Sequence, residues 1–382
     1  NKLYIESSVF NKLVSINENY IKSNLDINMS LFSGPLDIKY TRIANELLIY
    51  QSIFKSRLTL SFSKVHGETQ LSSNNFSDDV DFFNIFFNDN VLLYQCLFKG
   101  NANFAHSTFN DNTNFNNNIF KKNANFNSVS FNKNISFKNT VFIGDATFEN
   151  TLLPLHVDFS DVRIRGNKIS LENTKPVLPG KKIHINIKNT DINKIDFNYN
   201  DFRLFFPKDT NLEDKLFIYS GLLKKYQRLG MNNSYKVLFR EYREFKLLSE
   251  NKYIANFVEK NWWNYGLNKE WVYSWFAIII SILTLLNGFF YDIFVSKYFN
   301  INFLKVPQPN AACQLNPILN YIYNLPRAAI LTFFFVFATF LQVLANEDRI
   351  FKTDHFLVNT YVMLINCLGY IFIIFVLDIV TG

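Results

Sequence analysis

Residues 101–131 read NANFAHSTFNDNTNFNNNIFKKNANFNSVSF, with Phe at positions 104, 109, 115, 120, 126 and 131. The spacing between these Phe residues alternates between five and six. The same register covers residues 5–164, where two columns of Phe, Ile, Leu or Val each repeat every eleven residues without insertion or deletion. A short fixed period predicts one structural unit that is repeated and stacked on itself, which is a solenoid.

The residues between the apolar columns decide which kind of repeat this is. An eleven-residue period also occurs in right-handed coiled coils. Here, however, the intervening residues are Asn, Ser, Thr, Asp and Gly, and the first three are poor helix formers. Asn also tolerates the left-handed backbone conformation that tight corners need. A disordered low-complexity segment would not hold one register for this length. We therefore expect very short strands that carry the Phe residues, and corners at the Asn-rich pairs.

The segments ANF at 102–104, ANF at 124–126 and ATF at 146–148 resemble pentapeptide repeats. In that family a bulky residue stands at the centre of each five, with a small residue two positions earlier. The resemblance implies a quadrilateral β-helix with four faces per coil and, here, about 22 residues per coil. We expect about seven coils and a last partial one. Nine central residues are predicted to form the repeat core: Phe104, Phe109, Phe115, Phe120, Phe126, Phe131, Phe137, Phe142 and Phe148.

Residues downstream of the register predict helices. Residues 166–182 break the register and are predicted to form a loop. A helix is expected over 211–229 with Gly230 at its C-cap, followed by a second helix that starts after Asn233 or Ser234. The second helix carries a basic set that either binds anionic lipid headgroups or forms a solvated face. This set is Lys236, Arg240, Arg243 and Lys246.

Three apolar stretches near the C-terminus are long enough to cross a hydrocarbon core as helices. They lie at about 272–291, 328–345 and 356–377, and Pro326 and Arg327 are expected to fix the start of the second. The predicted fold class is therefore a pentapeptide-type β-solenoid, an α-helical hairpin and an α-helical transmembrane domain. The expected boundaries are 1–206 for the β-helix, 207–260 for the basic hairpin and 261–382 for the membrane domain.

Charge is distributed unevenly along the chain. Residues 161–271 carry a net charge of +8, residues 1–160 carry −1, and residues 272–382 are neutral. Basic residues beside a span favour the cytoplasmic side. We therefore expect a cytoplasmic solenoid and an external C-terminus. Four Trp residues are placed as an interfacial belt would be. They are Trp262, Trp263, Trp271 and Trp275.

A second resemblance concerns the segment before the first span. The runs YSGLLKKY at 219–226 and WNYGLN at 263–268, with Gly230 and Tyr235 between them, are similar to bacterial pentapeptide-repeat membrane proteins. The resemblance implies location in the bacterial inner membrane. Some members of that group place a potassium-channel-like pore after the repeats. Such a pore needs a carbonyl-lined filter of the TVGYG kind, and no such string lies between the spans.

Polar residues inside or beside the spans are the remaining candidates for function. Asn359 and Asn366 lie one heptad apart in the third span, and Asn287 and Gln342 lie near span ends. An amide at this depth either makes an interhelical hydrogen bond or lines a pore. Both interpretations of Asn366 stay open at this point.

Patterns typical of catalysis are missing from the sequence. The five His and three Cys residues have no metal-ligand or redox spacing. There is no phosphate-cradling Gly loop and no nucleophile elbow. We therefore predict a non-enzymatic protein without a metal or other cofactor. The near-neutral repeat segment also argues against DNA mimicry and a nucleic-acid partner.

Two functions follow from this organisation. In the first, the chain is a scaffold at the membrane, and its β-helix binds a protein partner. In the second, the membrane helices assemble into an oligomeric pore or channel-like protein, with the β-helix as a sensor or assembly domain. Three spans with few polar residues cannot line a wide pore alone, so the second function requires oligomers. Membrane lipids, a protein partner and a homo-oligomer are the expected contacts.

Overall fold

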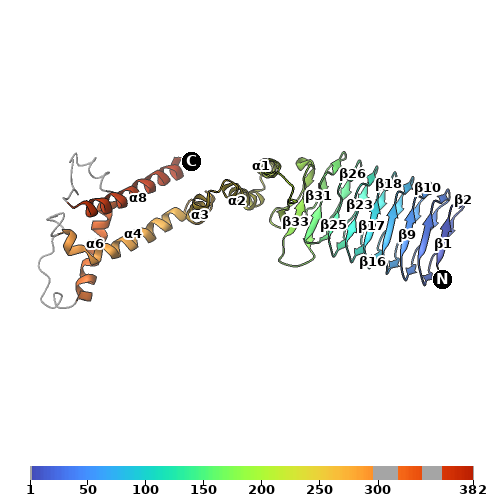
Figure 1. Ribbon diagram of the computed structural model, residues 1–382, viewed down its shortest axis with the longest axis horizontal. Coiled ribbons are helices and arrows are strands. Elements are labelled where there is room, and N and C mark those ends of the chain that lie inside the picture. The colour runs from blue at the N-terminus through green and yellow to red at the C-terminus, as the bar shows by residue number, and fades with distance from the viewer. Residues whose placement is uncertain (1, 296–316, 338–354, 382) are drawn as a thin grey trace. The chain divides into compact units, whose positions relative to one another are not determined.

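The computed structural model describes residues 2–295, 317–337 and 355–381. The N-terminal part is a parallel β-solenoid of about nine turns, as the sequence predicts. Each strand pairs in parallel with a strand of the next coil, so that Leu25 lies beside Leu47 and Phe54 lies beside Phe76. Figure 1 shows strands β1, β9, β17, β25 and β33 following one another along the solenoid. Four such ladders form the four faces, which are named sheets A to D here in chain order.

Sheet A contains the longest strands, of up to four residues, whereas every strand of sheet B has two residues. Sheet A consists of β1 (Leu3–Glu6), β5 (Leu25–Asn28), β9 (Leu47–Tyr50), β13 (Thr69–Ser72), β17 (Val91–Tyr94), β21 (Thr113–Asn114), β25 (Ile135–Ser136), β29 (His156–Asp158), β33 (Ile183–Asn186) and β35 (Phe202–Leu204). Sheet B consists of β2 (Val9–Phe10), β6 (Leu31–Phe32), β10 (Ile53–Phe54), β14 (Asn75–Phe76), β18 (Leu97–Phe98), β22 (Ile119–Phe120), β26 (Val141–Phe142) and β30 (Arg163–Ile164).

Sheets C and D complete each coil with two-residue strands. Sheet C consists of β3 (Val14–Ser15), β7 (Leu36–Asp37), β11 (Leu58–Thr59), β15 (Val80–Asp81), β19 (Ala102–Asn103), β23 (Ala124–Asn125), β27 (Ala146–Thr147), β31 (Ile169–Ser170) and β34 (Ile195–Asp196). Sheet D consists of β4 (Tyr20–Ile21), β8 (Arg42–Ile43), β12 (Lys64–Val65), β16 (Phe86–Phe87), β20 (Thr108–Phe109), β24 (Ser130–Phe131), β28 (Leu152–Leu153) and β32 (Lys175–Pro176).

A left-handed residue turns a corner within each five-residue step of the register. One non-glycine residue in every eleven adopts a left-handed conformation, two positions after the first apolar column. Examples are Tyr40 (φ 52°), Phe62 (φ 59°), Asn117 (φ 59°) and Asn139 (φ 58°). Asn adopts this conformation at lower cost than a bulky residue because its short polar side chain bonds locally. The left-handed corner therefore recurs with the eleven-residue period of the register.

Stacked rings fill the interior of the middle coils. Phe104 and Phe126 lie one coil apart, and their rings stack with centroids 5.0 Å apart and planes 1° apart. Phe104 follows β19 of sheet C, and Phe115 follows β21 of sheet A. These two rings meet edge to face at 5.3 Å and 82°. Both arrangements are ones that aromatic pairs prefer. All nine Phe residues of the predicted repeat core are 0–1% exposed.

Small polar side chains satisfy backbone carbonyls at the corners. The Thr140 hydroxyl, fully buried, donates to the carbonyl of Phe115 at 2.7 Å. Cys96 stands at the equivalent position, and its thiol donates to the carbonyl of Leu71 at 3.3 Å. Burial raises the pKa of the Cys96 thiol to about 11. Cys96 is thus a structural thiol in a position that Ser, Thr or Asn occupies in other coils.

The predicted loop over 166–182 is only partly a loop. Strands β31 and β32 continue sheets C and D, because Ile169 keeps its buried inward position. The coil is nevertheless longer than usual, since His156 pairs with His184 rather than with a residue 22 positions later. Pro176 lies in the edge strand of sheet D, where its missing N–H leaves no ladder bond unmade. The solenoid is therefore longer than the seven coils and a partial one that the register predicts.

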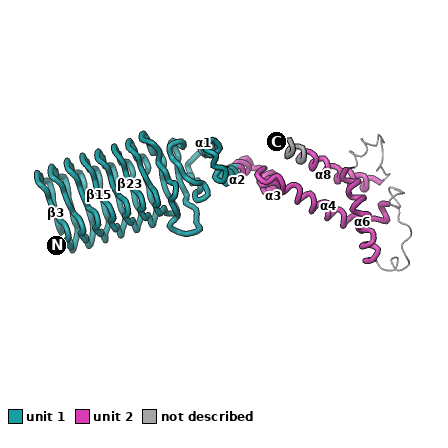
Figure 2. The backbone as a smooth tube through the Cα atoms, turned by 180° about the vertical axis from the view of Figure 1, so that it is seen from behind, with its two compact units in different colours: residues 1–242 teal, residues 243–382 magenta. Residues whose placement is uncertain are grey.

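The helices follow the last strand. They are α1 (Leu212–Arg228), α2 (Asn232–Ser249), α3 (Tyr253–Trp262), α4 (Trp271–Phe289), α6 (Pro317–Val336) and α8 (Phe356–Thr381). The Asn211 side chain caps α1 by accepting from the Asp214 N–H, and Gly230 (φ +67°) makes the left-handed turn before α2. The chain forms two compact units, residues 1–242 and 243–382 (Figure 2).

Helix α6 begins earlier than the predicted second span. The sequence places the start at residue 328, whereas α6 begins at Pro317 and contains Pro326 within it. Pro317 occupies the first position of the helix, where proline is well tolerated. The polar side chains of the early turns are also accommodated, since Asn320 donates to the carboxylate of Asp292 at 3.1 Å. Residues 338–345 of the predicted span lie outside the described residues.

Candidate functional site

A groove runs over the outer face of sheet A in its C-terminal half. It encloses about 450 Å³ and is lined by outward side chains of β17, β21, β25, β29 and β33, together with Phe205 and Pro207. Successive coils place Asn114, Ser136 and Asp158 in one outward row, because they are partners in the parallel register. The repeat therefore produces a row of hydrogen-bonding groups at the fixed spacing of a sheet ladder, about 4.8 Å.

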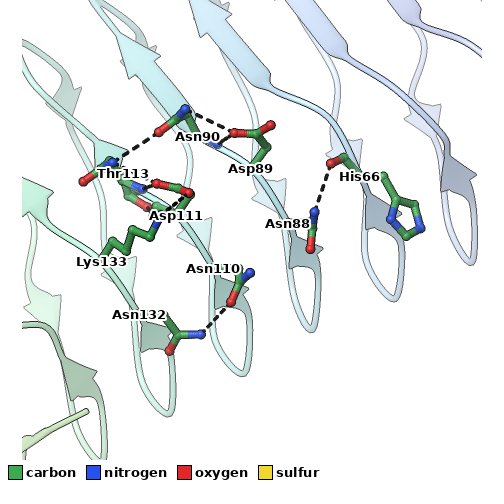
Figure 3. Close-up of polar contacts among 10 residues, drawn as sticks. His66, Asn88, Asp89, Asn90, Asn110, Asp111, Thr113, Asn132 and Lys133 are labelled. Carbon is green, nitrogen blue, oxygen red and sulfur yellow. Dashed lines mark hydrogen bonds and ion pairs between the residues drawn. The ribbon is translucent and has the colours of Figure 1, made fainter. Parts of the chain in front are cut away.

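Polar side chains of neighbouring coils hold one another in place beside the groove. Asn186 donates to the carboxylate of Asp158 at 2.9 Å, and Asn132 donates to the amide oxygen of Asn110 at 3.0 Å. Figure 3 shows this second contact beside the ion pair of Lys133 with Asp111, which measures 2.6 Å. The Lys133 ammonium is the main cause of a lowered pKa at Asp111. This wall of the solenoid thus consists of interlocked amides and carboxylates.

Two imidazoles and a phenyl ring close one end of the groove. The rings of His156 and His184 lie 5.1 Å apart, and His156 meets Phe205 edge to face at 5.8 Å. Burial, and then the charges of His156 and Arg203, lower the pKa of His184 below its ordinary value. The lowered pKa favours the neutral imidazole of His184, in which one nitrogen donates and one accepts. Within the described residues, no group of three or more His, Cys, Asp or Glu side chains could hold a metal ion.

A second polar cluster closes the C-terminal end of the solenoid. The Lys225 side chain of α1 is 3% exposed and donates to the carbonyls of Ile192 and Ile195 at 2.9 and 2.5 Å. Its ammonium also pairs with Asp196 at 2.6 Å. Carbonyls at the end of the last coil have no further coil to pair with, so this cation takes the place of the missing strand. The cluster is a structural cap.

Helix α2 contributes to the same end of the solenoid. The carboxylate of Glu241 accepts from the hydroxyls of Tyr199 and Tyr219, each at 2.8 Å. Burial, followed by the nearby Glu241 charge, raises the pKa of both tyrosines. Tyr219 and Lys225 lie in the run at 219–226 that carries the second resemblance, but the sequence predicts no capping role for them, for Tyr199 or for Glu241. Nothing in the repeat register marks where it will end.

The four basic residues predicted for lipid headgroups have different surroundings on α2. Lys236 and Arg240 are exposed, whereas Arg243 and Lys246 are half-buried. Arg243 makes a bidentate ion pair with Glu259, with N–O distances of 2.7 Å. Lipid binding by these four residues stays a prediction. The exposed Lys236 and Arg240 are better placed to contact headgroups than the half-buried Arg243 and Lys246.

One amide links α4, α6 and α8 in the second unit. Asn287 on α4 is fully buried, donates to the hydroxyl of Thr332 on α6 at 2.8 Å and accepts from the hydroxyl of Tyr361 on α8 at 2.8 Å. Ala328 and Leu331 of α6, both fully buried, belong to an apolar core that these helices share. Thr332 and Tyr361 were not among the predicted residues, although a hydroxyl within an apolar stretch is the signal that could have identified them.

The other predicted polar residues have less central positions. Asn359 and Asn366 are half-buried on α8. Gln342 lies outside the described residues. Whether Asn359 and Asn366 link helices or line a pore stays a prediction.

Two helices of this unit are long and apolar enough to cross a membrane. They are Trp271–Phe289 in α4 and Phe356–Ile374 in α8, and both leave most of their surface unburied. Large apolar side chains point outward, with Ile282 51% and Ile374 63% exposed. Such surfaces are stable when lipid covers them.

The four parallel sheets and the 22-residue coil are consistent with a pentapeptide-repeat fold. Comparison with protein-family models, curated proteins and solved structures finds no match to this chain.

Proposed function

We propose that this protein is a membrane-anchored scaffold, without enzymatic activity, whose solenoid is a binding platform for a protein partner. The observation that carries the proposal is that one chain joins a grooved repeat domain to two apolar helices of membrane-spanning length. A repeat β-solenoid is typically a structural or interaction scaffold. The helices supply the anchor, and the groove on sheet A supplies the binding surface.

The composition of the groove supports recognition of a polypeptide segment. Asn114, Ser136 and His184 offer donors and acceptors to main-chain amides, while Leu92 and Phe205 offer apolar surface to a side chain. The polar groups are already ordered by contacts between coils. Binding would therefore require little ordering of the platform, which favours affinity.

The polar links among the helices support the anchor function more than the pore. Both ends of the Asn287 amide are engaged by hydroxyls inside the bundle. An amide used in this way holds helices together instead of facing a water-filled channel. A pore would need several copies of the chain, and ion flux separates the two functions.

We further propose that the protein is a multi-pass protein of the bacterial inner membrane, with α6 as part of a third span and the solenoid in the cytoplasm. The coil length supports membership of the bacterial pentapeptide-repeat membrane proteins. The net charge of +8 over residues 161–271 supports the orientation. A reporter active only in the periplasm should be silent at the N-terminus and active after Gly382. The opposite pattern would reverse the orientation.

A photo-crosslinking residue at position 136, compared with one at position 125, tests the platform. Ser136 faces outward in the groove, and Asn125 is half-buried on sheet C, so both positions have similar exposure. In cells, position 136 should give a discrete crosslinked product with one protein, and position 125 should not. Equal products at both positions, or none at either, would contradict the platform.

Ion flux into liposomes tests the pore. We expect no flux with the wild-type protein at any voltage, and Asn366→Leu should alter assembly at most. Clear wild-type conductance that changes in Asn366→Leu or Asn359→Leu would contradict the scaffold proposal and support the pore.

A further inference from the structure

Helix α3 exposes a continuous apolar face. Tyr253, Ile254, Phe257 and Val258 are 63%, 82%, 69% and 48% exposed. At 3.6 residues per turn, these four positions lie within an arc of about 140°. Asn261 lies in the same arc, and its side-chain amide folds back onto the Phe257 carbonyl at 2.8 Å. A face of this composition is costly to leave in water.

The opposite face of α3 is fixed to its neighbours by charged and polar contacts. Glu259 binds Arg243 through two hydrogen bonds of 2.7 Å, and Lys260 pairs with Glu244 at 2.7 Å. The Tyr265 hydroxyl donates to Asn256 at 2.8 Å. These contacts set the rotation of α3 about its axis, so the apolar face points away from α2 and from the turn at Tyr265.

Two tryptophans join the end of α3 to the start of the first apolar span. The rings of Trp262 and Trp275 stack 6.4 Å apart with planes 12° apart. The indole N–H of Trp275 donates to the backbone carbonyl of Asn261 at 2.7 Å. Trp residues that flank an apolar span lie at the level of the lipid headgroups. The C-terminal end of α3 is therefore at headgroup depth when α4 crosses a membrane.

We propose that α3 lies in the membrane–water interface and inserts Tyr253, Ile254, Phe257 and Val258 into the lipid surface. The inference rests on the proposed membrane anchoring by α4. Lipid is the favoured occupant because Asn261 and Trp262 at the end of α3 contact Trp275 at the start of α4. The next turns of α4 expose Ile278 and Ile282, which are 48% and 51% exposed, so α3 adjoins a helix whose apolar surface also needs lipid. Interfacial helices of this kind bury their apolar face about 5–10 Å into the headgroup boundary.

Depth-dependent quenching in the full chain tests the proposal. Single cysteines at Ile254→Cys and Phe257→Cys are introduced into a Cys313→Ser/Cys367→Ser background, in which Cys96 stays buried. Ala255→Cys is the matched control on the other side of the same helix. Each variant carries a small fluorophore and is reconstituted into phosphatidylcholine–phosphatidylglycerol vesicles with brominated acyl chains.

Labels at 254 and 257 should be quenched by brominated lipid at least about threefold more than the label at 255, and should be shielded from aqueous iodide. Strong iodide quenching at 254 and 257 would overturn the proposal. Protection from both quenchers would also overturn it, because protein, such as a second copy, would then cover the face. An alkaline wash of the same vesicles tests the membrane anchor separately from the placement of α3. A chain that washes off refutes the anchor, whereas a retained chain without lipid quenching refutes only the placement of α3.

Discussion

The solenoid and the apolar helices are each stabilised by a different kind of contact. In the solenoid, rings stack and side chains bond to the next coil, as between Phe115 and Phe137 at 5.0 Å. Among the helices, the Asn287 amide joins residues that are 45 and 74 positions away in sequence. The first region repeats one modest interaction many times, whereas the second depends on a few unique ones. Stability in the solenoid is therefore close to a sum over neighbouring coils.

The largest effect is expected from a charge placed inside the ring stacks. Phe115→Asp should lower the free energy of unfolding by more than about 4 kcal/mol, because an unpaired carboxylate would be buried and the ring lost. Phe126→Asp should do the same. Phe115→Leu should cost far less, and Asn114→Asp, one residue away but facing outward, should be nearly silent. A β-type circular dichroism spectrum and thermal midpoint that survive in Phe115→Asp would refute the column assignment.

The cap at the end of the solenoid should be the next most sensitive place. Lys225→Met should destabilise the solenoid by about 3 kcal/mol, since it leaves Asp196 and two carbonyls without their buried cation. The neighbouring Lys224 is exposed, so Lys224→Met is the matched control. Chemical denaturation followed by circular dichroism measures both. Equal midpoints for the two variants would show that the last coil needs no cap.

A smaller effect is expected in the helical unit. Asn287→Leu removes two interhelical hydrogen bonds, each worth about 0.6–2 kcal/mol, while the thermal midpoint of the solenoid stays unchanged. Asn366→Leu should cost less, because Asn366 is half-buried and Asn287 is fully buried. Unfolding in mixed detergent micelles, followed by Trp fluorescence, reports on the helices. An Asn287→Leu variant as stable as wild type would show that the Asn287 hydrogen bonds do not stabilise the helices.

The smallest effect concerns the structural thiol. Burial raises the pKa of Cys96 to about 11 from 9.0, so the folded state keeps its proton at a pH where the unfolded thiol loses it. This contribution to stability is complete below pH 9 and declines as the pH rises from about 9 to 11. Cys96→Ser should preserve the corner hydrogen bond and make the decline between pH 9 and 11 smaller, because only the thiol's share is lost. A thiol that reacts quickly with an alkylating reagent in the native protein at pH 8 would show that Cys96 is not buried.

The solenoid could be predicted because its contacts are periodic. A bulky residue every five or six positions determines where the strands lie, where the corners lie and which side chains point inward. Thirty positions carry this signal. The prediction failed where the repeat changes. The long coil between His156 and His184 looks like a break in the sequence, yet Ile169 keeps the interior continuous.

The groove and the helical links were harder to predict for a different physical reason. One end of the groove depends on Phe205, which follows the last strand and meets His156 edge to face, and the repeat register does not extend to this residue. The Asn287 link depends on how three helices rotate, which composition does not specify. Span length could be predicted from hydropathy, but the partners Thr332 and Tyr361 required the packing.

The most direct test of the account is alkaline extraction of membranes that contain the full chain, followed by limited proteolysis of the washed membranes. We predict that the chain stays in the membrane fraction at high pH. We further predict that proteolysis between α2 and α4 releases a soluble fragment with a β-type spectrum, while peptides of α4 and α8 stay in the pellet. Recovery of the intact chain in the alkaline supernatant would contradict a solenoid anchored by membrane-spanning helices.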